Sequence, residues 1–235
     1  MSRLVSTGWL FFLFYLLKKC DQFILPLISN LKPLDALIDI EQARIKAKDL
    51  LGTKLSASLT YHCFEHTKWV VESSMTIAEN EGITDQNKLL ILESSAWFHD
   101  TGFTRMYKNH EQESCLIAKE ILPGLGASPS DMDYIYELIM ATSIPQTPFD
   151  MLGKIICDAD LDYLGRTDFP EWSERLKQEW LNFEIITDEQ DFYNRQFAFL
   201  KAYEYHTADA RKRRGPQKRK YLETLSNNAG YRLTT

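Results

Sequence analysis

The chain has 235 residues and a net charge of −6; 44% of its residues are apolar, and only 10 are glycine and 8 are proline. This apolar fraction supplies a sizeable core and excludes an intrinsically disordered chain, and the length fits one large domain with a terminal segment. The scarcity of helix-breaking residues favours helices over a β architecture with many turns.

The charge is unevenly distributed along the chain. Residues 211–220 (RKRRGPQKRK) hold seven basic side chains and no acidic one, so the rest of the chain carries a net charge of −13. An acidic body argues against general or sequence-specific nucleic-acid binding. The basic run could attract a phosphate group, RNA or a membrane surface, but we favour a solvated helix face.

The cysteines are widely spaced and form no Cys-x-x-Cys pair; they are Cys20, Cys63, Cys115 and Cys157. This usage is typical of reduced core thiols in a cytoplasmic protein and not of a disulfide framework.

Residues 1–32 are expected to form an N-terminal apolar segment ahead of a domain over residues 33–235. Residues 9–17 (WLFFLFYLL) are consecutive apolar residues, too few for the roughly 20 that a membrane-spanning helix needs. No small-residue cleavage site of a signal peptide follows them. Three roles remain open for this segment: a packing helix, a membrane-surface contact, or a contact between copies of the chain in a homo-oligomer. We rank them in that order.

Apolar residues recur at helical spacing along the main domain, without a strong alternating β pattern. Ser128 before Pro129 predicts one helix start, and Gly52 and Gly102 predict helix ends. We therefore expect an all-α domain of about eight or nine helices. The predicted helices span residues 35–51, 59–80, 86–99, 109–122, 129–141, 152–164, a segment from 168 onward, 189–207 and 217–225.

Four of the five histidines lie between positions 62 and 110. His62 and His66 are four residues apart on one predicted helix, so both side chains can face one cavity. His99 and Asp100 end an apolar helix in the segment AWFHDTG. Burying an imidazole and a carboxylate without a partner is costly, and a divalent cation removes that cost because both groups are its ordinary ligands.

Three carboxylates lie in the apolar segment IICDADLDYL, over residues 155–164. Asp158 and Asp162 share one helix face, whereas Asp160 lies about 200° around the helix from Asp158. Only one of these two faces can contribute directly to a single metal ion. The other carboxylates must cap a helix, pair with a base or hold a neighbouring ligand.

These motifs together resemble the HD superfamily of metal-dependent phosphohydrolases, whose pattern is H…HD…D on successive helices. The resemblance covers residues 60–166, with a looser tail to about 225. It is carried by four segments: YHCFEHT at 61–67, WFHDTG at 97–102, NHE at 109–111 with Ser114, and CDADLDYLG at 157–165. It implies an HD-domain helical bundle.

The resemblance also implies a ligand set for one divalent metal ion. A set of histidines and aspartates accepts Mn, Fe, Zn, Co or Mg, so the identity of the ion stays open. The matching residues are His66, His99, Asp100 and a late aspartate. The family's late ligand follows an alanine, so Asp160 is preferred and Asp158 is the second choice. Relatives with two or three metal ions carry a further histidine near position 141 or 142; this chain has Ala141-Thr142 there, which favours one ion.

His62 matches the Tyr-His-x-x-x-His segment of cyclic-nucleotide phosphodiesterases, where the first histidine protonates the leaving oxygen. The alternative for His62 is a hydrogen-bonded residue beside the ligands. Asp100 can both bind the ion and orient the attacking water. This chemistry suits phosphate-ester hydrolysis, which needs an activated water, charge neutralisation and a proton donor.

Several further residues are candidates for contacts to the phosphate. His110 lies in the family's His-Glu-x-x-x-Ser segment and would contact phosphate or support a second metal ion. Lys108 and Arg105 on the preceding loop are the nearest candidates for phosphate clamps, but we favour solvated loop positions for both. A solvated position is also the alternative for His110. Arg166 follows the aspartate segment and would bind phosphate or pair with Asp162.

The expected function is metal-dependent hydrolysis of a phosphate ester, with a nucleotide or another small phosphorylated metabolite as substrate. Either a phosphomonoesterase or a phosphodiesterase fits the residues. The alternative is a non-catalytic HD module that binds a metal ion or nucleotide, or contacts a partner. A complete ligand set argues for the enzyme.

Overall fold

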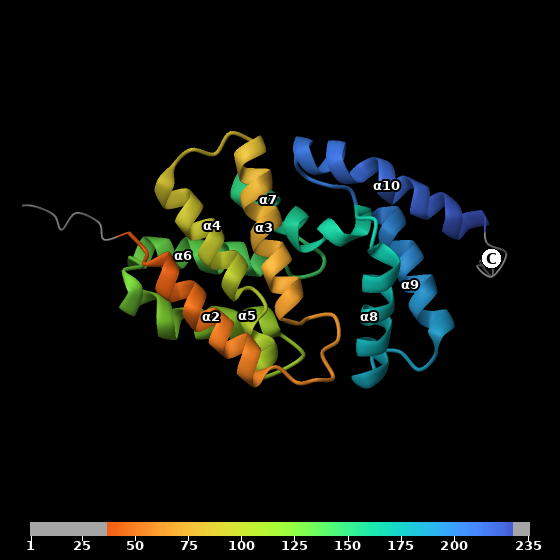
Figure 1. The fold of residues 1–235 in the computed structure, drawn as a ribbon, viewed down its shortest axis with the longest axis horizontal. Helices are drawn as coiled ribbons and strands as arrows, with labels where there is room; N and C mark the ends of the chain where they lie inside the picture. Colours follow the sequence, from red (N-terminus) through yellow and green to blue (C-terminus); the bar gives the residue numbers. More distant parts are fainter. Residues whose placement is uncertain (1–36, 228–235) are drawn as a thin grey trace, which may run out of the picture. The chain divides into compact units, whose positions relative to one another are not determined.

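The computed structural model describes residues 37–227; residues 1–36 and 228–235, and with them the predicted role of residues 9–17, lie outside the described part. Within residues 37–227 the chain forms nine α-helices, three short 3-10 helices and no strand (Figure 1). The predicted all-α class is therefore confirmed. None of the helices in this range is long and apolar enough to cross a membrane.

The α-helices are α2 (Ile40–Lys54), α3 (Phe64–Asn80), α4 (Gln86–Phe98), α5 (His110–Ile121), α6 (Pro129–Ala141), α7 (Met151–Asp160), α8 (Phe169–Asn182), α9 (Glu189–Ala202) and α10 (Ala208–Asn227). The 3-10 helices are η1 (Thr101–Thr104), η2 (Leu122–Leu125) and η3 (Asp162–Gly165).

Capping side chains fix where several helices begin. Asp85 accepts a hydrogen bond from the backbone N–H of Lys88 at the start of α4. Ser128 and Asp131 form a reciprocal capping box at the start of α6. These side chains satisfy N–H groups that have no partner inside the helix. The predicted starts at residues 86 and 129 are confirmed.

Other predicted boundaries are wrong. α2 begins at Ile40, five residues after its predicted start at residue 35. It runs through Gly52 to Lys54, because one glycine in a helix interior costs only about 1 kcal/mol of stability. The aspartate helix ends at Asp160 and continues as the separate turn η3. α9 ends at Ala202, before the predicted end at 207.

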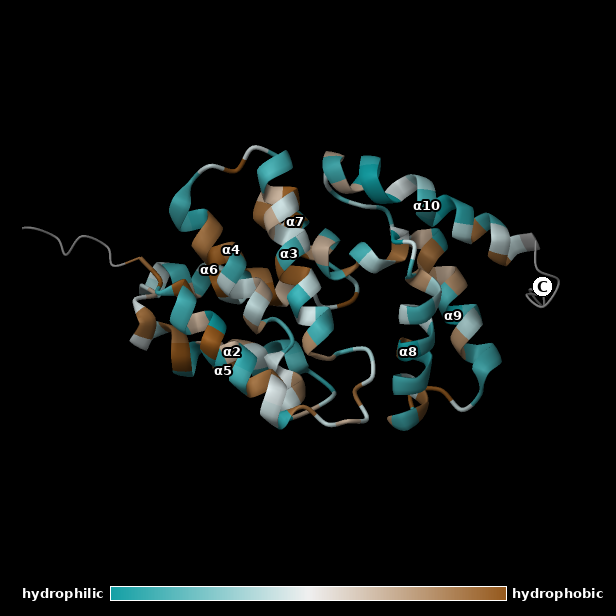
Figure 2. Cartoon of the chain, viewed as in Figure 1, coloured by the Kyte–Doolittle hydropathy of each residue, from teal (hydrophilic) through white to brown (hydrophobic). Residues whose placement is uncertain are grey.

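The last helix differs most from the prediction, because α10 begins at Ala208 and continues through Pro216. Arg214 pairs with Asp162 of η3 before the proline, and Lys218 donates to the carbonyl oxygen of Tyr203 after it. These anchors hold both halves of the helix against the domain. Much of the helix is hydrophilic (Figure 2). Part of the basic run is thus engaged within the fold, so the predicted wholly solvated face is wrong for those residues.

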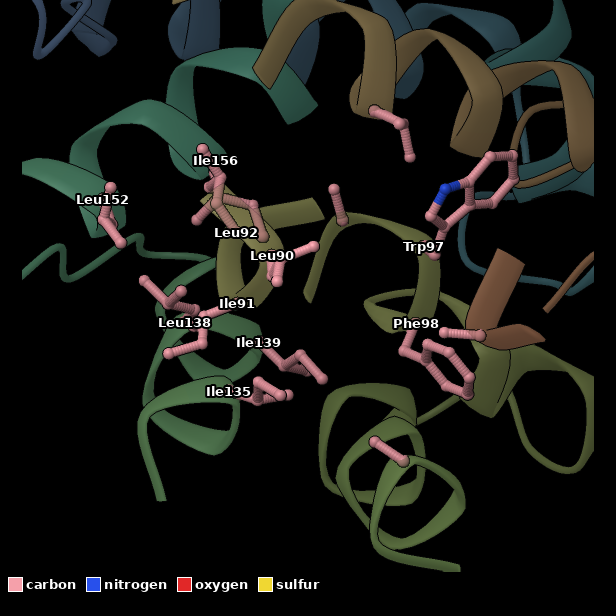
Figure 3. Close-up of a cluster of buried hydrophobic side chains, with 14 of the residues drawn as sticks. Leu90, Ile91, Leu92, Trp97, Phe98, Ile135, Leu138, Ile139, Leu152 and Ile156 are labelled. Atoms are coloured by element: carbon pink, nitrogen blue, oxygen red, sulfur yellow. The ribbon is translucent and has the colours of Figure 1, made fainter. Parts of the chain in front are cut away.

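The main core lies among α3, α4, α6 and α7. Figure 3 shows Leu92 of α4, Leu138 of α6 and Ile156 of α7 pointing toward one another, and all three are fully buried. A smaller cluster joins η3, α8 and α9, and consists of Tyr61, Leu161, Tyr163, Leu164, Phe169, Trp172 and Leu200. The segment from α7 to η3 passes from one cluster to the other, which places Asp160 where they meet.

Candidate metal centre

Four side chains converge where α3 begins and α4 and α7 end. His66 lies in the first turn of α3, His99 and Asp100 follow α4, and Asp160 ends α7. Nε2 of His66 lies 3.3 Å from Oδ2 of Asp100 and 3.2 Å from Oδ1 of Asp160. Nε2 of His99 lies 3.2 Å and 3.7 Å from the same two oxygen atoms. The structure therefore brings together all four residues that the sequence analysis assigns as ligands.

Three of these donor atoms are buried and make no hydrogen bond within the described part of the chain: His66 Nε2, His99 Nε2 and Asp100 Oδ2. Each such unpaired atom costs about 1–3 kcal/mol, so three of them at one point need a partner. Ligand atoms about 2.1 Å from a divalent ion lie roughly 3.0–3.4 Å apart, close to the separations found here. The residues fit a divalent metal ion.

The tautomer of His99 is fixed by a hydrogen bond to the backbone. Its Nδ1 lies 2.8 Å from the carbonyl oxygen of Ala96, which can only accept, so Nδ1 carries the proton. Nε2 is then the ring atom with a free lone pair, and it is the atom that faces Asp100 and Asp160. This is the usual support for a histidine that binds a metal ion.

The metal-free cluster is strongly coupled electrostatically. Burial opposes a charge on His99, but the carboxylates of Asp100 and Asp160 outweigh it and hold the pKa of His99 well above 6.5. In turn, the histidines overcome the effect of burial and lower the pKa of Asp160 to about 2. Both aspartates are therefore ionised at neutral pH and ready to bind a cation.

The turn that carries Asp100 is held against α5 by a close backbone approach. The N–H of Gly102 donates to Oγ of Ser114 over 2.8 Å. A Cβ atom at position 102 would lie 1.9 Å from the carbonyl oxygen of His110, so a side chain is excluded there. The approach also places Nε2 of His110 3.6 Å from Oδ1 of Asp100.

His62 lies before α3 and not on it, so the predicted shared helix face with His66 is wrong. α3 begins at Phe64, and its cap Cys63 has extended backbone. The two histidine rings are nevertheless 5.8 Å apart between centroids. His62 reaches the site from the loop instead of from the helix.

Glu179 on α8 positions His62 and was missed by the sequence analysis. Its Oε1 lies 2.5 Å from Nδ1 of His62, and its Oε2 accepts hydrogen bonds from the backbone N–H groups of Tyr61 and His62. Tyr107 donates its hydroxyl hydrogen to Oε1 as well. Burial disfavours a charged His62, but Glu179 outweighs it and raises the pKa of His62 above 6.5.

A weak signal for Glu179 exists in the sequence. It lies seven residues after Trp172 and three after Leu176, on the face of α8 where an apolar residue is expected. A fully buried carboxylate at such a position needs a specific partner. Nothing in the local sequence identifies that partner as His62.

A cavity of about 600 Å³ opens in front of the four convergent side chains. His62, Asp100, His110 and Asp160 all line it. The ring of Phe103 stacks against those of His62 and His110, at centroid distances of 4.2 Å and 3.8 Å, and so helps to keep both histidines in place. Lys108 also lines the cavity and is exposed.

Asp158 faces away from the convergent side chains. Its two oxygen atoms accept hydrogen bonds from the hydroxyl of Tyr203, the N–H of His206, and both the N–H and the hydroxyl of Thr207. The carboxylate therefore holds the chain that leads into α10. Of the two candidate aspartates, the structure places Asp160 at the centre, as preferred.

Two predicted phosphate contacts lie elsewhere in the structure. Arg105 pairs with Glu113 and Glu120 and does not line the cavity. Arg166 pairs with Asp168, and its guanidinium lies 3.7 Å from the ring centroid of Trp69. The proposed pairing of Arg166 with Asp162 is wrong, because Asp162 binds Arg214 over 2.7 Å.

No protein-family model matches this sequence, and no curated protein matches it either. Solved structures do match this chain. A predicted HD superfamily hydrolase from an uncultured Thermotogales bacterium has a TM-score of 0.53 and 18% identity, over 82% of this chain and 92% of that one. The chain has an HD-domain fold.

Two further structures resemble this HD domain. A Lactobacillus plantarum protein has a TM-score of 0.59 and 13% identity, over 80% of this chain and 93% of its own. Bacillus subtilis YpgQ, solved in complex with ADP, has a TM-score of 0.51 and 21% identity, over 78% of this chain and 94% of that one. Nearly the whole of each of these structures is covered, so the similarity of fold extends over the entire domain. The chemistry of this chain depends on the side chains at its own site.

Proposed function

We propose that this HD domain is a metal-dependent phosphohydrolase that acts on a nucleotide or another small phosphorylated metabolite. The observation that carries the proposal is the convergence of His66, His99, Asp100 and Asp160, with three buried donor atoms that lack any other partner. These four residues would hold one divalent ion. The ion would supply Lewis acidity toward a water molecule and the phosphoryl oxygens.

The side chains around the centre have separate roles in this reaction. Oδ2 of Asp100 faces the histidines, while its Oδ1, 3.6 Å from Nε2 of His110, is free to accept a hydrogen bond from the attacking water. Lys108 at the cavity edge offers its ammonium group to a phosphate oxygen. Water then adds to phosphorus as the bond to the leaving oxygen breaks.

His62 supplies the proton that the leaving oxygen needs. Since Nδ1 is held by Glu179, Nε2 is the ring atom that can donate. The raised pKa keeps a substantial fraction of His62 protonated near neutral pH. The products are an alcohol and a phosphate, or an alcohol and a phosphomonoester where the substrate is a diester.

The substrate class is supported by cavity size and by one relative. A cavity of about 600 Å³ has room for a nucleotide-sized molecule, and the Bacillus subtilis relative was solved with ADP. Nucleotides therefore belong in the set of esters to be assayed, beside other small phosphate esters.

The test is hydrolysis by the full chain after its metal content has been measured. Mononucleotides, cyclic nucleotides and other phosphate esters are assayed with Mn, Fe, Zn, Co and Mg in turn. We expect metal-dependent release of phosphate or of a monoester, loss of turnover in Asp160→Asn, and no loss in Asp133→Asn, an exposed aspartate of α6. A chain that holds metal but hydrolyses none of these esters is a binding module, not an enzyme.

A further inference from the structure

One part of the cavity wall is built by α8, α9 and the segment between them. These helices lie side by side (Figure 1), and Gln196 of α9 donates to Oγ of Ser173 of α8. Their contribution to the cavity is mostly apolar, since five of the seven lining residues are Leu176, Trp180, Ile185, Phe192 and Phe199. All but Phe192 are only half-buried, so their side chains are available to a ligand.

The other two lining residues of this wall, Arg195 and Gln196, are polar, and each is bound to a neighbouring residue of the wall. Arg195 is bound to Asp191, with its Nε 3.0 Å from Oδ1 of that carboxylate. The amide nitrogen of Gln196 is engaged by Ser173. This wall therefore offers little to the hydroxyl groups of a sugar, which would lose their hydrogen bonds to water on entering it.

We propose that the substrate is a phosphate ester whose organic part is apolar, an alkyl or aryl group that packs against the α8–α9 wall. This inference rests on the proposed function and names the substrate class. In such a complex the phosphate lies at the metal-binding residues and the apolar group extends toward Trp180 and Ile185. The cavity is far larger than a phosphate alone requires, and burial of apolar surface is the chief attraction that its outer wall can provide.

A homologous series of n-alkyl phosphates, from ethyl to octyl, tests this directly. Each methylene that becomes buried should raise kcat/KM about fourfold, until the chain outgrows the cavity. Glycerol phosphate, ribose 5-phosphate and nucleoside monophosphates are the polar comparison. A preference for these polar esters, with no gain along the alkyl series, overturns the inference and leaves the proposed function standing.

Binding of n-alkylphosphonates to the metal-loaded full chain gives a second measurement that needs no turnover. The affinity should rise along the series in calorimetry, and Ile185→Asn should flatten the rise. Ile45→Asn is the matched control, because Ile45 is exposed on α2 and does not line the cavity. A rise in affinity without hydrolysis of any ester supports the wall assignment while the proposed function fails. Equal affinities along the series overturn the inference.

Discussion

Nδ1 of His62 lies 2.5 Å from Oε1 of Glu179, although the two residues are 117 positions apart in the sequence. The same carboxylate accepts hydrogen bonds from the backbone N–H groups of Tyr61 and His62, so it orients both the ring and the loop that carries it. This contact fixes the position of His62, the proposed proton donor, although the residue lies outside α3. It is also the part of the site that the HD motif does not contain.

The Glu179→Gln variant tests how this contact sets the pH range of activity. His62 must be protonated to act as an acid, and its pKa in the folded protein is raised above 6.5 by Glu179 against the opposing effect of burial. Turnover should therefore persist below that raised pKa and fall as the pH rises through it. Loss of the carboxylate charge should move the fall to lower pH. An unshifted pH–rate profile would show that Glu179 does not act through His62.

The His62→Gln variant tests the role of the ring itself. Loss of a general acid should lower kcat about 10²–10⁴-fold for an ester with a poor leaving group. An ester of p-nitrophenol, whose leaving group needs no proton, should lose much less. Metal content should stay at the wild-type level, because His62 is not among the four proposed ligands. Equal losses on both esters would favour a purely structural role for His62.

Substitution of Asp158 and of Asp160 by alanine should distinguish a structural role from a metal-binding role. Asp158→Ala leaves four donors from Tyr203, His206 and Thr207 without an acceptor, and should lower the free energy of unfolding by at least about 3 kcal/mol. Asp160→Ala should abolish metal binding and cost the metal-free protein less stability. Urea unfolding and metal analysis of both variants check this. Loss of metal in folded Asp158→Ala alone would reverse the assignment.

Gly102→Ala should disrupt the contact between the Asp100 turn and α5. The new Cβ would lie 1.9 Å from the carbonyl oxygen of His110, and relief of that clash requires a backbone shift, at a cost of about 1–3 kcal/mol or more. Gly52→Ala in α2 is the matched control. No neighbouring atom lies within 4 Å of a Cβ placed at position 52, so this substitution should stabilise the domain by up to about 1 kcal/mol. Thermal unfolding of both variants measures the difference. Equal stability of the two would contradict the close approach.

The sequence predicts the helices and the four convergent residues well, because both depend on local patterns. Apolar periodicity and caps such as Ser128 mark the helices, and His99-Asp100 at the end of an apolar segment marks the site. The sequence does not predict that His62 leaves the helix. That outcome depends on the backbone hydrogen bonds to Glu179, a contact between distant segments.

The same limit applies to the arginines. Arg105 and Arg166 are candidates for phosphate contact because they lie close in sequence to the proposed ligands, but Glu120 and Asp168 bind them instead. Similarly, a proline inside a helix is expected to interrupt it, but α10 continues through Pro216. Contacts of Arg214 and Lys218 with the domain hold the helix on both sides of the proline.

Metal binding should release a proton near neutral pH. In the metal-free protein the pKa of His99 is held well above 6.5, so its ring carries a proton that a metal ion must displace. The affinity for the ion should therefore rise as the pH rises toward that pKa and level off above it. Calorimetry in buffers of different ionisation enthalpy measures the proton count. An affinity independent of pH between 6 and 8 would contradict the coupling.

The central claim, that His66, His99, Asp100 and Asp160 hold one divalent ion, is tested most directly by elemental analysis of the purified full chain. After loading with each candidate ion and removal of the excess, we expect about one ion per chain in the wild type and in Asp133→Asn. We expect essentially none in His66→Ala or Asp160→Asn, with folding of each variant checked by circular dichroism. A wild-type chain that cannot be loaded, or ligand variants that retain the ion, would contradict the claim.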